Sequence, residues 1–185
     1  MNRVFLTKLH LIAAALMLPA ILMFLFTGAL YTWGETGAWR EDTVAVELSA
    51  PLTGDEGQFR EIAGRLLSER DLPMPSGKSK LTGEGAEASF QWSGARSEIA
   101  LAPTADPLVA EATIKEASLH RWLVQLHKAK GSVFFKVYAS ILALVLFVLS
   151  VSGVILGLQV RPYRRLTIVS SAVGVIAFVA AVLLG

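Results

Sequence analysis

Three histidines are the residues of this 185-residue chain that most plainly could do chemistry. They are His10, His120 and His127, and each lies beside a long apolar stretch. The chain has no cysteine, which excludes disulfides, iron–sulfur clusters, thiolate zinc sites and cysteine nucleophiles. Neutral imidazole is an axial ligand of haem iron, so all three histidines are candidate haem ligands. The alternative is that they are interfacial residues at helix ends, with polar tips at the level of the lipid headgroups.

The spacing of the histidines limits how they could share one iron. His120 and His127 are seven residues apart, on one flank of a predicted helix but about 10 Å apart along its axis. His10 is expected at the opposite membrane face, across about 30 Å of hydrocarbon. A haem with two histidine ligands is therefore hard to build within one chain. It would need a homodimer, a single-histidine haem or a partner membrane subunit.

Three segments can each cross a bilayer. They are the uncharged stretches Leu9–Gly34, Val137–Val160 and Leu166–Gly185, and a helix of about 20 residues spans the hydrocarbon core. The first is longer than the apolar region of a signal peptide, so we expect it to be retained. The predicted fold class is an α-helical membrane protein with three transmembrane helices and a small extracytoplasmic α+β domain. The formal net charge of only +2 gives no reason to expect nucleic acid as a partner.

Basic residues near the ends of these segments predict the orientation. Arg3 and Lys8 precede the first segment, and three arginines between positions 161 and 165 separate the second from the third. The positive-inside rule places both groups in the cytoplasm and residues 35–118 outside. The outer segment holds all fifteen acidic residues and eight basic ones, a net charge of −7. Four basic residues depart from the rule by crowding the outer approach to the second membrane helix: Arg121, Lys128, Lys130 and Lys136.

The apolar pattern around His120 predicts a further helix at the outer membrane surface. Leu119, Trp122, Leu123 and Leu126 recur at helical spacing, so the segment is amphipathic. The predicted organisation, in chain order, is a cytoplasmic N-terminus 1–8, transmembrane helix 9–33, extracytoplasmic domain 35–118, interfacial helix 119–132, transmembrane helix 133–160, cytoplasmic turn 161–165 and transmembrane helix 166–185.

The outer segment carries the signals of a small α+β domain. Apolar residues alternate in Thr43–Leu48, which predicts a strand with one buried face. Residues 55–70 have apolar residues at helical spacing, with Thr53 as the expected N-cap. Further strands are predicted at 78–82, 86–92, 96–101 and 109–114, where Gly-containing turns separate most of the runs. These elements predict one helix packed on an antiparallel sheet.

Small residues predict how the second and third membrane helices pack. Gly153 and Gly157 form a GxxxG pattern, and Ser170 and Gly174 repeat small-xxx-small spacing on the third helix. Such residues allow close approach of two helix backbones, so the two helices are expected to pack as a hairpin. No ionisable residue lies in the middle of a span, which argues against an ion-coupled transporter or a proton relay.

Short motifs at the ends of the membrane segments point to a family. The first segment begins with Lys8-Leu9-His10 and nears its end at Thr27-Gly28. Leu119-His120-Arg121 leads into the second membrane helix, which nears its end at Ser152-Gly153 and is followed by a basic Arg-Pro-Tyr-Arg-Arg sequence. Taken together, these segments resemble the PepSY-associated transmembrane helix family, and the outer domain stands where that family carries a PepSY-like domain.

The resemblance implies a function in iron handling. Family members with four or more spans are similar to inner-membrane reductases that carry haem b and act on iron–siderophore complexes. The resemblance assigns ligand roles to His10 and His120, with His127 as an additional candidate, and places the chain in a bacterial cytoplasmic (inner) membrane. Any enzymatic role would be that of an oxidoreductase component for electron transfer. The alternative is a non-enzymatic, membrane-anchored PepSY module that binds or regulates a partner protein at the outer face.

Overall fold

The computed structural model describes residues 3–185, so the first two residues of the predicted cytoplasmic segment 1–8 lie outside the described residues. The chain divides into two compact units. One consists of residues 3–21 and 139–185, and the other of residues 22–138. The first unit is entirely helical, and the second contains the β-sheet and the helices next to it.

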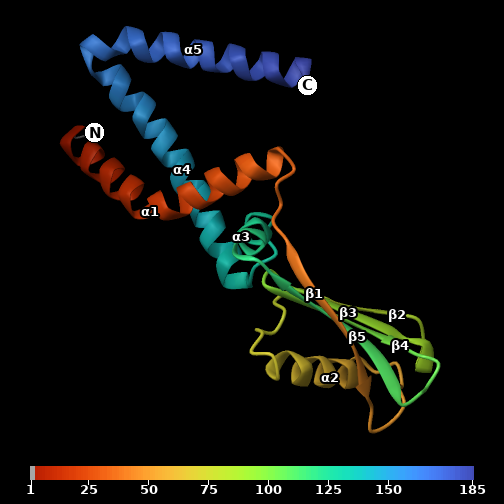
Figure 1. The fold of residues 1–185 in the computed structure, drawn as a ribbon. Helices are drawn as coiled ribbons and strands as arrows, with labels where there is room; N and C mark the ends of the chain where they lie inside the picture. Colours follow the sequence, from red (N-terminus) through yellow and green to blue (C-terminus); the bar gives the residue numbers. More distant parts are fainter. Residues whose placement is uncertain (1–2) are drawn as a thin grey trace. The chain divides into compact units, whose positions relative to one another are not determined.

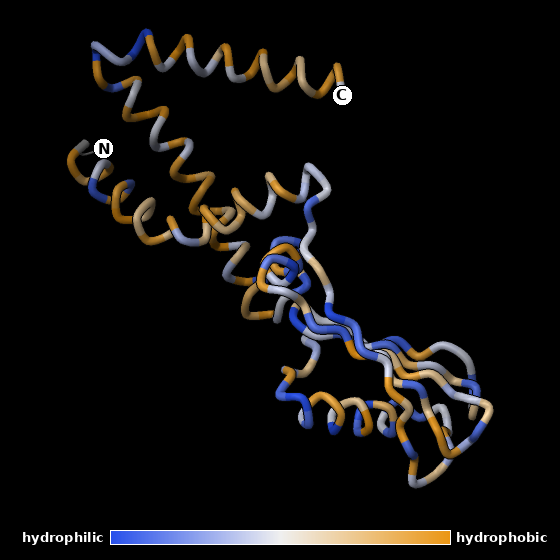
Figure 2. Tube along the Cα trace, in the orientation of Figure 1, coloured by the Kyte–Doolittle hydropathy of each residue, from blue (hydrophilic) through white to orange (hydrophobic). Residues whose placement is uncertain are grey.

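Three long apolar helices make the chain a membrane protein, as predicted. Helix α1 spans Arg3–Thr32, α4 spans Val133–Gln159 and α5 spans Arg161–Leu184. Each is long enough and apolar enough to cross a bilayer, and each is drawn mainly in orange, the apolar end of the scale, in Figure 2. Most of their large apolar side chains are exposed, which is the pattern expected of helices that turn apolar surface toward lipid.

Helix α5 begins earlier than predicted. The residues expected to form the turn 161–165 lie in its first part, and only Val160 separates it from α4. Pro162 favours this start, because proline in the first turn of a helix has no N–H that would otherwise lack a partner. Nearly all residues of α5 are exposed. The two helices of the α4–α5 hairpin predicted from small residues therefore do not pack together along the whole of α5.

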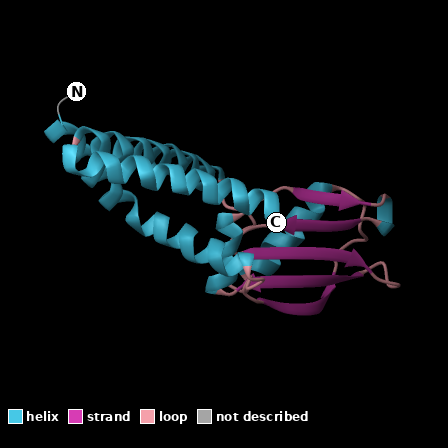
Figure 3. Ribbon diagram, turned by 90° about the horizontal axis from the view of Figure 1, so that it is seen from above, coloured by secondary structure: helices cyan, strands magenta, loops and turns pink. Residues whose placement is uncertain are grey.

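A five-stranded antiparallel sheet forms the centre of the second unit. Its strand order is β1-β5-β4-β3-β2, and Figure 3 shows the strands in magenta. The elements of this unit are β1 (Trp39–Glu47), α2 (Glu56–Ser68), β2 (Ser79–Thr82), the short 3-10 helix η1 (Gly85–Glu87), β3 (Ser89–Ser93), β4 (Ser97–Pro103), β5 (Val109–Ala117) and α3 (Leu119–His127). The predicted α+β class of the domain at residues 35–118 is confirmed.

Helix α2 covers one face of this sheet, as Figure 1 shows. Strands β1 and β5 pair over their full lengths, and their alternating side chains send every second residue toward the helix. Val46 and Leu48 are buried there, as the alternation in Thr43–Leu48 predicted. The helix contributes its own buried stripe to the same core: Phe59, Ala63, Leu66 and Leu67.

The N-cap of α2 is Asp55 and not the predicted Thr53. The Asp55 carboxylate accepts a hydrogen bond from the backbone N–H of Gln58 at 3.1 Å, which satisfies one of the free donors of the first turn. The backbone N–H and hydroxyl of Thr53 both donate instead to the side-chain amide oxygen of Gln58. Thr53 therefore holds the segment before the helix through Gln58, and the Asp55 carboxylate is the N-cap.

Helix α3 ends at His127, earlier than the predicted boundary at residue 132. Ala129 has a positive φ of 57°, and a left-handed residue just beyond the last turn is a common way for a helix to end. The backbone N–H of Lys130 donates to the carbonyl of Gln125, which closes this end. The apolar stripe of the helix was predicted from the sequence, but its terminus was not.

The start of α2 gives a pH-dependent prediction. The hydroxyl of Ser79 donates to the Glu56 carboxylate, and Arg60 lies beside it, with its Nε 2.9 Å from a Glu56 oxygen. These interactions, the Ser79 hydrogen bond first, lower the pKa of Glu56 below its usual 4.5. A lowered pKa in the folded state stabilises the fold at neutral pH, and this contribution is lost as the pH falls below about 4.5.

We therefore expect Glu56→Gln to destabilise the full-length protein at pH 7 and to have a smaller effect at pH 3. Urea unfolding in detergent at both pH values, followed by tryptophan fluorescence, measures the difference. Glu61→Gln is the matched control, because Glu61 lies on the same helix and forms none of the ion pairs found among residues 3–185. An effect of Glu56→Gln that is the same at both pH values would contradict the prediction.

Candidate functional site

His127, the last residue of α3, is held against the end of α1 in the second unit. Its Nδ1 lies 3.0 Å from the hydroxyl oxygen of Thr27, and its ring centroid lies 4.9 Å from that of Phe24. Gly28 makes this approach possible, because a Cβ atom at this position would stand 3.1 Å from Cε1 of the imidazole. The imidazole therefore packs directly on a glycine of a membrane helix.

The hydroxyl of Thr27 determines that Nδ1 of His127 is a hydrogen-bond donor. Thr27 is buried, and its hydroxyl donates to the carbonyl of Met23 at 2.6 Å. Since a hydroxyl has one hydrogen, its oxygen must accept the hydrogen bond from Nδ1–H of the imidazole. The other ring nitrogen, Nε2, forms no hydrogen bond with any residue that the structure describes.

His10 is held in the same way in the first unit. Its Nδ1 lies 2.8 Å from the hydroxyl oxygen of Ser152 on α4. Ser152 is buried and donates its own hydrogen to the carbonyl of Leu149 at 3.0 Å, so it accepts from Nδ1–H. A Cβ atom on Gly153 would stand 3.7 Å from Cε1 of His10. His10 thus donates from Nδ1–H, and Nε2 is the ring nitrogen that this hydrogen bond leaves available.

The two histidines share one local design. Each hydroxyl–glycine dipeptide, Thr27-Gly28 on α1 and Ser152-Gly153 on α4, holds a histidine from elsewhere in the chain. In both cases the hydroxyl accepts from Nδ1–H and the glycine faces Cε1. Histidines that ligate metals almost always donate their second N–H to a neighbouring acceptor, which fixes the tautomer and the ring orientation. The residues present therefore fit the role of haem iron ligands through Nε2.

His120 differs from the other two candidates. It lies in the first turn of α3, and its Nε2 is buried without a hydrogen-bond partner among the described residues. Two neighbours on the same helix share this feature, since Nε of Arg121 and both amide atoms of Gln125 are also buried without partners. Buried polar atoms normally find a partner, so this part of α3 has unused capacity to bind a polar group.

The three candidates form no common cluster among the described residues. His10 belongs to the first compact unit, whereas His120 and His127 belong to the second. Within residues 3–185, no hydrogen bond or ring contact joins two of the histidines, and no group of three or more His, Asp or Glu side chains is placed to hold a metal ion. Each histidine is therefore a separate candidate ligand for a haem iron.

The small residues predicted to pack helices divide into two groups. Gly157 faces the side chain of Thr167, which identifies it as the point where α4 and α5 approach each other closely. Gly153 faces His10 instead. Ser170 and Gly174 lie on the exposed part of α5, and nothing stands within 4 Å of a Cβ placed on Gly174. Both positions are exposed in this chain. Close helix packing at Ser170 and Gly174 therefore stays a prediction.

The hydroxyl partners were not assigned by sequence reasoning. Ser152 donates to the backbone carbonyl of Leu149 and also accepts from His10. Thr27 and His127 are 100 residues apart in the sequence, and His10 and Ser152 are 142 residues apart. A local sequence pattern therefore could not connect them. The available signal was a hydroxyl residue followed by glycine near the end of each of the first two membrane helices.

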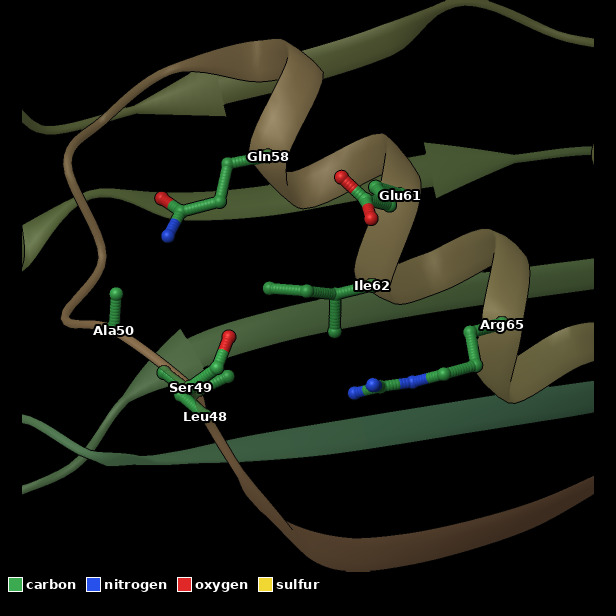
Figure 4. Close-up of a pocket in the computed structure, with 7 residues that line it drawn as sticks. All are labelled: Leu48, Ser49, Ala50, Gln58, Glu61, Ile62 and Arg65. Atoms are coloured by element: carbon green, nitrogen blue, oxygen red, sulfur yellow. The ribbon is translucent and has the colours of Figure 1, made fainter.

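A small pocket beside α2 has polar lining but no distinctive chemistry. Figure 4 shows Gln58, Glu61, Ile62 and Arg65 projecting from the helix toward the loop at residues 48–50, around a cavity of about 140 Å³. The charged side chains that line it are exposed, and none of its polar side-chain atoms is buried without a partner within the described chain. We assign no site there.

The fold and the histidines together define a class of protein. It is an α-helical membrane protein with an α+β domain between its first two spans and with histidines hydrogen-bonded to membrane-helix hydroxyls. The family model for the PepSY-associated TM region matches residues 1–159, and the chain belongs to this family. The resemblance inferred from the sequence is thereby confirmed. The comparisons with curated proteins and with solved structures gave no match.

Proposed function

We propose that this protein is a haem b-binding electron-transfer subunit of a bacterial cytoplasmic membrane, linked to the reduction of iron–siderophore complexes. The observation that carries the proposal is the repeated hydroxyl–imidazole arrangement at His10 and His127. The two imidazoles each direct Nδ1–H to a hydroxyl acceptor. This leaves Nε2 of each ring as the nitrogen for iron. Membership of the PepSY-associated TM family supports the membrane setting.

The residues divide into ligands and positioning residues. His10 and His127 would hold the iron through Nε2, and Ser152 and Thr27 would keep the two rings in the correct tautomer and orientation. His120 is a third candidate, because its Nε2 is buried and unpartnered in the described structure. Bound haem b would supply one-electron redox chemistry at its iron.

A second chain is part of this proposal. The predicted topology has the N-terminus in the cytoplasm and residues 35–118 outside, which places His10 and His127 at opposite membrane faces. An iron with two histidine ligands then needs one imidazole from each of two chains. We propose that a homodimer or a partner membrane subunit supplies the second imidazole.

The proposed reaction can be tested directly on purified protein. Full-length protein from haem-replete cells, reduced anaerobically with dithionite and freed of excess reductant, should show a b-type α-band. Addition of a ferric hydroxamate siderophore should remove that band, while the gallium complex of the same siderophore should not. A haem that stays reduced with the ferric complex would contradict the iron-reduction step but not haem binding.

One observation favours a second function, that of a non-enzymatic module which binds a partner protein. The sheet face opposite α2 is covered by no other described element and carries small residues such as Ala45 and Ala100 beside exposed carboxylates such as Glu47 and Glu111. A flat face of this kind can receive a complementary protein surface. If this second function is correct, the double variant Glu47→Lys/Glu111→Lys should lose the cellular phenotype while its haem content stays unchanged. An unaltered phenotype in the double variant would exclude the partner-binding function.

A further inference from the structure

An apolar pocket lies where the outer domain meets the start of the second membrane helix. Its volume is about 410 Å³, and it is lined by residues of the 73–76 loop, the start of β4, helix α3 and the first turn of α4. All of these segments belong to the second compact unit. The large apolar side chains that line it are Met74, Trp122, Leu126, Phe134 and Phe135. A pocket with such a lining is suited to a hydrocarbon chain or another apolar group.

The position of the pocket in the chain gives it access to lipid. Phe134 and Phe135 are the second and third residues of α4, a helix apolar enough to cross a bilayer. Phe134 is 85% exposed, so its ring stands at the open side of the pocket. Trp122 comes from the amphipathic helix α3, and tryptophan is enriched at the level of lipid headgroups. The pocket therefore opens where a membrane helix begins.

The pocket also carries an available positive charge. Arg96 is exposed, lines the pocket, and holds its guanidinium 5.4 Å from the ring centroid of Trp122. It forms none of the ion pairs found among residues 3–185. A guanidinium beside an apolar lining matches an amphiphile that has an anionic head and a hydrocarbon tail.

The basic residues around α3 support the same partner. Lys128 and Lys130 follow this helix, and Lys136 lies in the first turn of α4, at the side of the membrane where the positive-inside rule expects few positive charges. Lys130 contacts Glu98 at 3.8 Å, and Lys128 lies over the ring of Tyr31. Lysines and arginines next to a membrane attract anionic lipid. Attraction to lipid headgroups therefore explains why basic residues gather around α3, which the positive-inside rule does not.

We propose that this pocket binds one anionic glycerophospholipid of the leaflet that borders the outer domain. An acyl chain lies against Trp122, Leu126 and Phe135, and the headgroup phosphate pairs with Arg96. The bound lipid would join the outer domain to the start of α4. This site is separate from the histidines, and it does not depend on whether the protein carries haem.

Native mass spectrometry of the full-length protein tests the proposal. The protein is delipidated in detergent and then titrated with dioleoylphosphatidylglycerol or with dioleoylphosphatidylcholine. We expect the wild type to retain one phosphatidylglycerol at concentrations where phosphatidylcholine is lost, and Arg96→Gln to weaken phosphatidylglycerol retention about tenfold, the loss expected for one charge-assisted contact. Arg40→Gln is the control, because Arg40 is an exposed arginine of the same domain outside the pocket.

A second variant tests the pocket independently of the charge. Met74→Trp places a larger side chain in the cavity, so it should reduce retention of both lipids while the tryptophan-monitored unfolding midpoint stays within the range of the control. Quenching of Trp122 by brominated phosphatidylglycerol, taken as the difference between each protein and the same protein carrying Trp122→Phe, should fall in both the Arg96→Gln and Met74→Trp variants. Equal retention of the two lipids, unchanged in both variants, would show ordinary annular lipid contact and overturn the proposal.

Discussion

Replacing Phe59 with alanine should lower the free energy of unfolding of the α+β domain by about 3–5 kcal/mol. Phe59 is fully buried between α2 and the sheet, and its ring stacks on that of Phe90 with the centroids 5.4 Å apart. Truncation loses the transfer free energy of the ring and leaves a cavity that close-packed neighbours fill only in part. Urea unfolding of the full-length protein in detergent, followed by tryptophan fluorescence, measures this change.

The control for Phe59→Ala is Leu108→Ala in the same domain. Leu108 is 47% exposed, so its truncation should change the free energy of unfolding by no more than about 0.5 kcal/mol. Phe59→Leu should fall between the two, because it keeps part of the buried volume. A loss below about 1 kcal/mol for Phe59→Ala would contradict the assignment of α2 as the cover of this core.

Replacing Gly28 with leucine should weaken haem binding at His127 by about tenfold or more and so lower the haem content, if the proposed function is correct. A Cβ atom at position 28 stands 3.1 Å from Cε1 of His127, and the rest of a leucine side chain would displace the ring from the Thr27 hydroxyl. Leucine is a better helix former than glycine, so a weakened α1 could not explain the loss. The Soret absorbance per protein measures occupancy.

Gly174→Leu is the matched control for this substitution. It makes the same chemical change in another membrane helix, at a position where no described atom stands within 4 Å of the added Cβ. We expect normal haem content in this variant. Thr27→Val gives an independent check, because valine keeps the shape of threonine but cannot accept from Nδ1–H. Normal haem content in both Gly28→Leu and Thr27→Val would mean that His127 is not a ligand.

Much of the fold could be predicted from local pattern. The alternation in Thr43–Leu48 and the Gly-containing turns after residue 76 were sufficient to locate the strands, because side-chain period and turn chemistry are local properties. The start of β1 was missed. Its first residues include Arg40, Glu41 and Asp42, which show no apolar alternation, and they are strand because of their pairing with β5, about seventy residues away.

The helix ends show the limits of the same reasoning. Both Thr53 and Asp55 are good N-cap residues, and only the geometry of the loop decides that Asp55 takes this place. The basic residues after Val160 were predicted to form a turn because they are charged. Pro162 among them is nevertheless well suited to the first turn of a helix. Charge predicted which side of the membrane these residues prefer, but it did not predict their backbone conformation.

The candidate site was predictable in its residues but not in its connections. Histidine is rare in this chain, so residue type alone singled out His10 and His127. Their hydroxyl partners are separated from them by 142 and 100 residues, and only the packing of α1 against α4 and α3 reveals them. The resemblance to the family implied His10 and His120 as ligands, whereas the hydrogen bonds favour His10 and His127.

The absorption spectrum of the full-length protein, purified in detergent from haem-replete cells, tests haem ligation most directly. We expect a Soret band and, on reduction, a b-type α-band, at a stoichiometry that falls in His10→Ala and in His127→Ala and is lost in the double variant. External imidazole should restore part of the absorbance in the single variants. A wild-type protein without haem, or a double variant with an unchanged spectrum, would contradict ligation by these two histidines.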